Sequence, residues 1–186
     1  MRLILLAAGM SRRFGENKLM WTLDGKPMMR HILEILMRLE NERGWEVTVV
    51  SREGSAADMA RSLGAQVVIN PISEQGISTS IHAALDSFAG ASCPAAFFVA
   101  DQPRITYGTI AEFLDAYAAS GKGLGCVAHD GELGNPAVFS PEYFPELMAI
   151  QGDRGGKSVI KRHLDDCYIH QVDDARELSD IDTKPD

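Results

Sequence analysis

The chain has 186 residues, a length that fits one domain. Eighteen Lys and Arg against 26 Asp and Glu give a formal net charge of −8, which argues against a nucleic-acid binder because such proteins need a basic face. Hydrophobic residues make up 45% of the chain, but no apolar run approaches the roughly 20 residues of a membrane helix.

The apolar stretch at the start of the chain reads as a buried strand. Seven residues, Leu3 to Gly9, are followed closely by Arg12 and Arg13. The h-region of a signal peptide would be expected to continue further, so a first strand explains the pattern better. The three cysteines form neither a disulfide framework nor a metal or redox motif. We therefore expect reduced thiols in a cytoplasmic protein.

Strand-like and helix-like stretches alternate along the first two thirds of the chain. In chain order, the patterns predict a strand at 3–7, a helix at 26–43 with Pro27 in its first turn, a strand at 46–51, a helix at 55–63, a strand at 66–69, a helix at 78–88, a strand at 95–100, a helix at 106–118 and a strand at 124–128.

This alternation predicts an α/β fold with a mostly parallel sheet and helices on both faces. Ligands bind such sheets outside the carboxyl ends of the strands, which draws attention to the loops after Ala7 and Ala100. After residue 130 the pattern loosens and glycines and prolines become frequent. We expect that part to form a looser lobe covering one end of the sheet.

The loop after the first strand combines glycine with positive charge. Gly9 and Gly15 allow tight turns that present backbone amides to an anion, while Arg12, Arg13 and Lys18 add charge. The spacing matches neither a P-loop nor a dinucleotide-binding fingerprint. The pattern predicts a phosphate site, with a solvated surface loop as the alternative.

Asp101 comes directly after the fourth predicted strand and precedes Gln102 and Pro103. A carboxylate at the end of a central strand is well placed to hold Mg²⁺ on a polyphosphate. The alternative is an Asp that caps a helix or a turn. Because both loops would face one crevice, together they favour the functional interpretation.

The order of several short motifs resembles the MobA-like nucleotidyltransferase superfamily and, within it, most closely the molybdenum-cofactor cytidylyltransferase branch. The motifs span nearly the whole chain: Leu-Ala-Ala-Gly-x-Ser-x-Arg-Phe-Gly-x-x-Lys at 6–18, Leu-x-Gly-Lys-Pro-Met at 23–28, Gly-Ile-Ser-Thr-Ser-Ile at 76–81, Asp-Gln-Pro at 101–103, Gly-Asn-Pro at 134–136, Gly-Asp-Arg-Gly-Gly at 152–156 and Asp-Ile-Asp-Thr at 180–183.

The resemblance implies a three-layer Rossmann-like fold over residues 1–186, with a nucleotide-binding part at about 1–105 and an acceptor-binding part at about 106–186. It implies Mg²⁺-dependent transfer of CMP from CTP to a pterin phosphate, giving a dinucleotide cofactor and pyrophosphate. An apo-molybdenum hydroxylase or its chaperone would be the partner that receives the product.

The resemblance also assigns residues to roles. Arg13, Lys18 and Asp101 would be catalytic, Asp101 and Asp182 would bind the metal, and Asn135 and Asp153 would lie toward the acceptor. The nucleotide-binding residues would be Leu6, Ala7, Ala8, Gly9, Ser11, Arg12, Arg13, Gly15, Lys18, Gly76, Ser78 and Ser80.

Two positions depart from the family pattern. Asn135 stands where the molybdenum branch often has His, and Lys184 separates Thr183 from Pro185 where the family commonly runs Thr-Pro. Since relatives continue into a final helix beyond this point, we expect the carboxylate of Asp182 to be held less firmly here.

Two rival functions stay open. Transfer to a sugar phosphate or polyol phosphate is one, although the short segment between Val127 and Phe139 leaves little room for the long dimerising arm of some such enzymes. The other is a non-catalytic nucleotide or pterin carrier for molybdenum hydroxylases. Lys18 and Asp101 argue against a carrier, which does not need groups that handle charge during a reaction.

Overall fold

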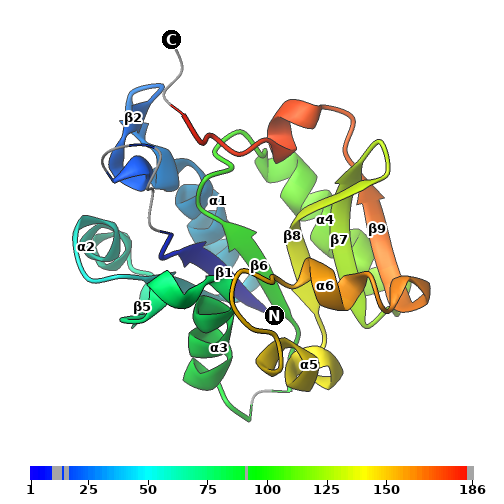
Figure 1. The fold of residues 1–186 in the computed structure, drawn as a ribbon. Coiled ribbons are helices and arrows are strands. Elements are labelled where there is room, and N and C mark those ends of the chain that lie inside the picture. The colour runs from blue at the N-terminus through cyan, green and yellow to red at the C-terminus, as the bar shows by residue number, and fades with distance from the viewer. Residues whose placement is uncertain (10–13, 15–16, 91, 184–186) are drawn as a thin grey trace.

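The computed structural model describes residues 1–9, 14, 17–90 and 92–183. Its main feature is a seven-stranded sheet with the order β5-β4-β1-β6-β8-β7-β9 (Figure 1). These strands are β1 (Arg2–Ala7), β4 (Glu46–Ser51), β5 (Gln66–Ile69), β6 (Ala95–Val99), β7 (Leu124–His129), β8 (Glu132–Phe139) and β9 (Cys167–Gln171). All neighbouring pairs are parallel except the two that β8 makes with β6 and β7. The predicted mostly parallel sheet is confirmed.

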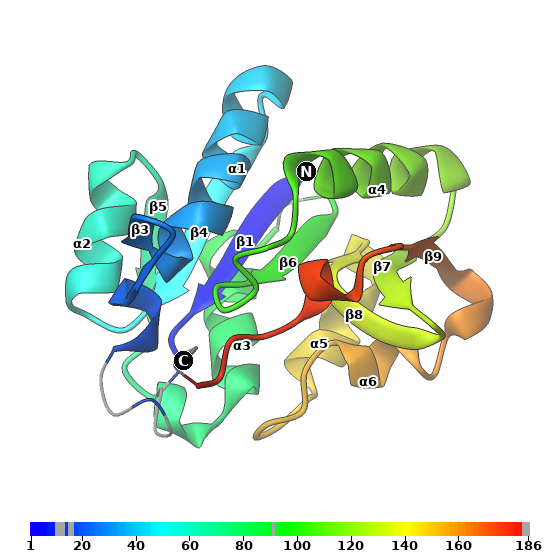
Figure 2. The same ribbon diagram turned by 90° about the horizontal axis from the view of Figure 1, so that it is seen from above.

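Helices cover both faces of this sheet, as predicted, and give three layers (Figure 2). The helices are α1 (Met28–Arg43), α2 (Ser55–Ser62), α3 (Ile77–Ser87), α4 (Tyr107–Ser120), α5 (Phe144–Met148) and α6 (Lys157–Ile160). Short 3-10 turns complete the chain: η1 (Lys18–Met20), η2 (Ser73–Gln75), η3 (Pro141–Tyr143), η4 (Leu164–Asp166) and η5 (Ala175–Leu178). Within the described ranges, no helix has the length and apolar character that crossing a membrane requires.

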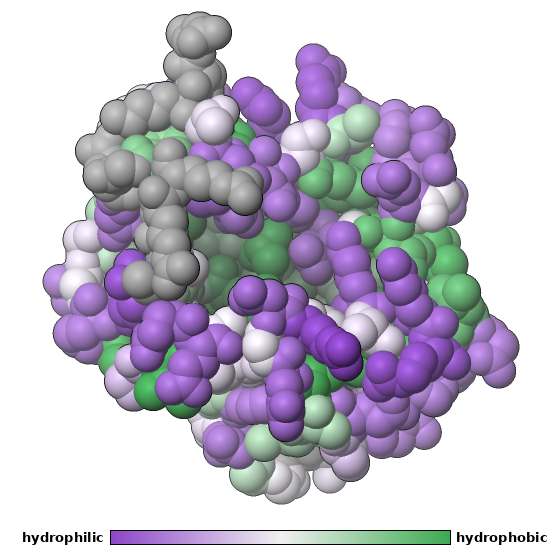
Figure 3. All heavy atoms as spheres, in the orientation of Figure 1, coloured by the Kyte–Doolittle hydropathy of each residue, from purple (hydrophilic) through white to green (hydrophobic). Residues whose placement is uncertain are grey.

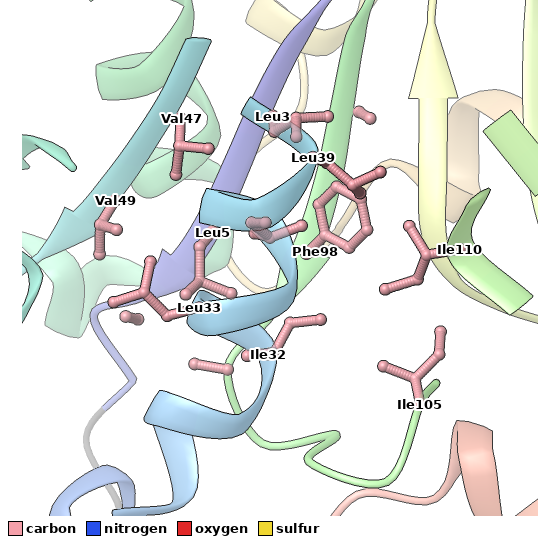
Figure 4. Packing of buried hydrophobic residues seen from close by; sticks show 14 of the residues in the cluster. Leu3, Leu5, Ile32, Leu33, Leu39, Val47, Val49, Phe98, Ile105 and Ile110 are labelled. Carbon is pink, nitrogen blue, oxygen red and sulfur yellow. The ribbon is translucent and has the colours of Figure 1, made fainter. Parts of the chain in front are cut away.

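Alternation along the strands divides the core between the two faces. Leu3 and Leu5 of β1 pack under α1 together with Phe98 of β6, as Figure 4 shows. Ile4, between those leucines, belongs to the cluster on the opposite face, where it packs with residues of α3 such as Ile81. Neighbouring residues of one strand point to opposite faces, so a strand buried on both sides must be apolar throughout. This requirement explains the continuous apolar run at the start of the chain.

The predicted looser lobe after residue 130 is wrong. β7 and β8 form a hairpin, and β8 inserts between β6 and β7 near the middle of the sheet. Asp130 and Gly131 form the turn with φ values of 47° and 83°, the left-handed conformations that a tight two-residue hairpin requires. Gly134 and the cis Asn135–Pro136 bond lie within β8, which hides its strand character in the sequence.

A second, smaller hairpin precedes α1. β2 (Thr22–Leu23) pairs with β3 (Lys26–Pro27) around an Asp24–Gly25 turn. Pro27 therefore belongs to a strand, and the helix predicted from residue 26 begins at Met28 instead.

Candidate active site

A cavity of about 460 Å³ lies at the carboxyl ends of β1 and β6, where the sequence pattern places a ligand. Its apolar lining comes from Leu6, Ala7, Ala8, Phe14, Leu19, Ile77, Val99 and Ala100, and its other lining residues are Gly9, Lys18, Ser73, Glu74, Gly76, Ser80, Asp101, Asp153 and Asp182. Figure 3 shows a hollow on this face with an apolar floor and a polar rim. An apolar floor with polar groups at its edge is the usual form of a small-molecule site.

Lys18 lies at the centre of the polar rim and joins two distant parts of the chain. Its Nζ donates to Asp101 Oδ2 at 3.0 Å and to Asp182 Oδ1 at 2.9 Å. The lysine side chain is only 10% exposed, whereas the Asp182 side chain is 60% exposed. One buried ammonium group therefore holds two carboxylates on the edge of the cavity.

The position of Lys18 follows from its local structure. It begins the 3-10 turn η1, where Asn17 Oδ1 accepts a hydrogen bond from the backbone N–H of Leu19 at 3.3 Å. Leu19 is buried in the core beside Met29 of α1. This anchor fixes the backbone of the turn, so the lysine extends from a supported position.

Electrostatics keep Lys18 charged although it is buried. Burial opposes the ammonium form and is the largest single influence, but the hydrogen bonds and charges of Asp182 and Asp101 together outweigh it and raise the pKa of Lys18. Burial and then the negative charge of Asp101 also raise the pKa of Asp180. Among the described residues that line the cavity, carboxylates thus outnumber the single cation, Lys18.

The last part of the described chain passes the carboxyl end of β6 and brings Asp182 to this site (Figure 2). We call residues 177–182 the C-terminal strap. The Oε2 atom of Glu177 accepts hydrogen bonds from Thr106 N at 2.9 Å and Thr109 Oγ1 at 2.6 Å, at the start of α4. Further along, the backbone N–H of Ile181 donates to the carbonyl of Asp101 at 3.0 Å.

A tight backbone contact forms another wall of the cavity. Gly76, with φ of 112°, precedes α3 and lies against Gly152, and the N–H of Ser78 donates to the carbonyl of Gly152 at 3.1 Å. A Cβ on Gly76 would lie 2.2 Å from the carbonyl carbon of Gly152. This close approach brings the next residue, Asp153, into the cavity lining.

Most of the described residues that sequence reasoning selected converge on this cavity. Leu6, Ala7, Ala8, Gly9, Lys18, Gly76, Ser80, Asp101, Asp153 and Asp182 all line it. Ser78 is buried and outside the lining, and its backbone N–H bonds to Gly152 in the wall. Asn135 is outside the lining, although the pairing of Phe97 with Ala137 places this part of β8 at the same edge of the sheet. Ser11, Arg12, Arg13 and Gly15 lie outside the described residues.

Sequence reasoning missed several lining residues. Ser73 and Glu74 line the cavity from η2, and Ile77 from the first turn of α3. Ser73 and Glu74 come shortly before the Gly-Ile-Ser motif and Ile77 lies within it, so their position in the sequence was the available signal. The Asp-Gln-Pro motif gives no sign of the role of Gln102, which is 6% exposed and contacts the strap.

The family follows from a comparison with known domain families. Residues 3–167 match the model of the MobA-like NTP transferase domain. The chain belongs to the MobA-like NTP transferase domain family. This membership confirms the resemblance of the motifs and makes the protein a nucleotidyltransferase by family.

Relatives of this MobA-like chain agree with that result. The purine catabolism protein PucB of Bacillus subtilis is 26% identical over 190 residues, covering 97% of this chain and 90% of PucB. A protein of Pyrococcus horikoshii named as a probable molybdenum cofactor guanylyltransferase is 33% identical over 81 residues, covering 44% and 40% of the two chains.

A solved structure shares the fold. Rv0371c of Mycobacterium tuberculosis superposes with a TM-score of 0.80 at 22% identity, covering 98% of this chain and 93% of its own. Rv0371c has also been solved in complex with manganese. Divalent metals are common in nucleotidyltransferases of the MobA-like family.

The donor set of this MobA-like site suits a divalent cation bound to a nucleotide. The described lining residues carry four carboxylates and one ammonium group, so a polyphosphate would meet net negative charge without added cations. The carboxylates of Asp101 and Asp182 both contact the ammonium group of Lys18 and so lie close together. Carboxylate oxygens are ligands that Mg²⁺ prefers, and phosphate oxygens and water would complete its coordination. Among the described residues, no group of three or more His, Cys, Asp or Glu could hold a metal alone.

Proposed function

We propose that the protein is a Mg²⁺-dependent cytidylyltransferase that transfers CMP from CTP to the phosphate of a molybdenum-pterin cofactor. The observation that carries the proposal is the convergence of Lys18, Asp101 and Asp182 beside Ala8 in one cavity. The products would be pyrophosphate and a cytosine dinucleotide cofactor. An apo-molybdenum hydroxylase or its chaperone would receive the dinucleotide.

The chemistry requires positioning and charge rather than a protein nucleophile. An oxygen of the acceptor phosphate attacks the α-phosphorus of CTP, a new P–O bond forms, and the bond to the β-phosphate oxygen breaks to release pyrophosphate. Two anions approach each other and the leaving group carries negative charge, so cations and orientation provide most of the rate enhancement. A site built from an ammonium group and carboxylates for a metal is suited to this task.

Each role in the proposal belongs to particular residues. Asp101 and Asp182 would hold Mg²⁺, which would neutralise phosphate oxygens when bound. Lys18, which lines the cavity beside both carboxylates, would neutralise charge that develops in the transfer. The backbone from Ala8 onward would cradle the phosphates. Arg13 stays a prediction from the sequence, since it lies outside the described residues.

Ala8 supports cytosine as the base. Its side chain is buried and lines the cavity. The methyl group occupies space that a purine would use beside this strand end, whereas the smaller cytosine ring would fit. The base would lie between this residue and the wall made by Gly76 and Ser80.

The acceptor would enter from the side of Asp153. This residue lines the cavity on the loop that packs against Gly76. Asn135, within β8 near the carboxyl end of β6, would contact the acceptor beyond the cavity. Only a short hairpin joins Val127 to Phe139, which disfavours a sugar or polyol phosphate transferase with a long dimerising arm.

Guanylyl transfer is the second candidate. It is favoured by the partial match to the Pyrococcus horikoshii protein, whose name specifies a guanylyltransferase. It differs from the first only in the base, so one experiment distinguishes the two.

The test incubates the protein with molybdenum-pterin cofactor, Mg²⁺ and CTP, GTP or ATP in separate reactions. Pyrophosphate release gives the rate, and mass spectrometry identifies the dinucleotide. The proposal expects release with CTP well above the other two and a cytosine dinucleotide product. Release with GTP alone would replace it by the second candidate. No release with any nucleotide and this acceptor would contradict both.

A further inference from the structure

The side chain of Gln102 is buried directly after Asp101 and uses its amide nitrogen on two partners. Nε2 donates to the carbonyl of Leu178 at 2.9 Å and to Asp180 Oδ1 at 2.8 Å. Both acceptors belong to the C-terminal strap. Gln102 is 6% exposed, so little water is available to replace either bond.

The bonds of Gln102 fall in the middle of the strap, between its anchor on α4 and the active site. Beyond them, the Ile181 N–H bonds to the carbonyl of Asp101, and the Ile181 side chain is buried beside Leu23 and Met28. Asp182 then reaches Lys18. Asp101 lines the cavity, and the next residue, Gln102, fastens the segment that bears Asp182.

From this arrangement we infer that Gln102 is a positioning residue that sets the carboxylate of Asp182 opposite that of Asp101. The inference rests on the proposed function, in which these two carboxylates hold the metal. Gln102 itself does not line the cavity and has no contact with the reacting groups. It acts through the strap and fixes the spacing between the carboxylates of Asp101 and Asp182, which are 81 positions apart in the sequence.

The amide group, rather than the size of the side chain, is what the arrangement requires. Leu178 presents a carbonyl oxygen and Asp180 a carboxylate, and both can only accept. Gln102→Glu keeps the shape but replaces the donor by a second carboxylate facing two acceptors. The strap would lose both bonds and would be repelled by the new charge.

The experiment compares the full-length wild-type protein with Gln102→Glu, Asp182→Asn and the double variant. Hydrogen exchange of the strap amides, followed by mass spectrometry, tests the fastening independently of activity. Cytidylyl transfer tests its consequence. Gln66→Glu on the edge strand β5 makes the same charge change at an exposed position and is the control. Gln102→Met, which removes the donor without adding charge, serves if Gln102→Glu does not fold.

We expect Gln102→Glu to speed exchange of the strap amides at least about tenfold, which corresponds to a loss of about 1.4 kcal/mol in local stability. Its kcat should fall by about the same factor as that of Asp182→Asn. The double variant should be no slower than either single variant, because both changes remove one interaction. Gln66→Glu should match the wild type in both measurements.

Two results would overturn the inference. Unchanged strap exchange in Gln102→Glu would show that Gln102 does not fasten the strap. A double variant slowed by the product of the two single effects would show that Gln102 acts independently of Asp182. Absence of any nucleotidyl transfer by the wild type would instead overturn the proposed function, a result that the exchange measurement would not share.

Discussion

Lys18 combines two properties that rarely occur together, since it is nearly buried and yet keeps its charge. Two carboxylates support the ammonium group in the absence of substrate, so the charge is already in place before a nucleotide arrives. A preorganised charge costs little reorganisation during the reaction. This arrangement makes Lys18 the residue at which ground-state binding and transition-state stabilisation can be separated experimentally.

We predict that Lys18→Met lowers kcat and kcat/KM together by about two orders of magnitude, as expected for loss of a preorganised charge. Methionine retains most of the aliphatic stem, so the packing of this buried side chain should survive. Steady-state kinetics over a range of CTP concentrations up to saturation measure the effect, with Lys161→Met, at an exposed position, as control. A rise in KM with unchanged kcat would limit Lys18 to holding ground-state phosphate.

Ala8 offers the second test at this scale. We predict that Ala8→Gly gains partial acceptance of GTP while CTP remains usable, because glycine removes the methyl group beside the base. One methyl contributes only about 1–3 kcal/mol, so other contacts must share the discrimination. The ratio of kcat/KM for CTP and GTP, measured in both proteins with the same pterin acceptor, decides the point. An unchanged ratio would reject the steric explanation.

At the scale of elements, the junction of α3 with the 152–156 loop depends on the absence of one side chain. Gly76→Ala would combine a positive φ with a Cβ placed 2.2 Å from backbone of Gly152. We predict a loss of about 1–3 kcal/mol in unfolding free energy and a weaker acceptor affinity, since the loop bearing Asp153 must move.

Chemical denaturation and the KM for the pterin acceptor measure both effects. Gly108→Ala within α4 is the matched control, because its Cβ would meet only Thr106 Oγ1 at 3.7 Å. Helix propensity there favours alanine by about 1 kcal/mol, so the control should be as stable as the wild type or more stable. Equal behaviour of the two variants would contradict the proposed close packing.

The elements that could be predicted from the sequence are those whose periodicity is uninterrupted. β1, α1 and β4 carry clear apolar patterns; the predicted bounds of β4 match the observed ones, and the predicted starts of β1 and α1 differ by one and two residues. β8 was missed because glycine, asparagine and proline interrupt its apolar pattern. Its position between β6 and β7 also departs from the order of these strands in the sequence. The Asp130–Gly131 pair was the local signal for the hairpin, since few other dipeptides adopt that turn so readily.

The site shows the same division. Asp101 closely follows β6, and Lys18 comes at the end of the loop that follows β1, so topology alone could place both at the carboxyl ends of these strands. Asp182 was available only through the family motif, since no periodic pattern indicates that the strap returns to β6. The role of Gln102 depends on a contact across 76 positions to Leu178, which a single sequence does not reveal.

For the whole molecule, ligand binding should appear as added stability. Lys18 of η1 contacts Asp182 of the strap, and Ile181 of the strap packs with Leu23 and Met28, so a nucleotide and metal bound there would hold distant segments together. At 100 times the dissociation constant, a ligand adds about 2.7 kcal/mol. For a chain of this size, we predict a rise in Tm of about 5–10 °C with CTP and Mg²⁺.

Differential scanning calorimetry at several CTP concentrations measures this rise. Asp101→Asn removes one metal carboxylate, so the part of the rise that depends on Mg²⁺ should shrink while the ligand-free Tm changes little. GTP should stabilise less than CTP. A Tm that is independent of CTP concentration would argue against nucleotide binding at this cavity.

The insertion of β8 between β6 and β7 also bears on how the chain is made. β6 leaves the ribosome with one edge lacking its final neighbour, and that edge is closed only when the later β7–β8 hairpin arrives. A fragment cut near residue 105 would keep the predicted phosphate loop, Lys18 and Asp101 but would expose the hydrogen-bonding groups of β6 to other chains. Attempts to express the nucleotide-binding part alone should therefore yield aggregates rather than a minimal binding module.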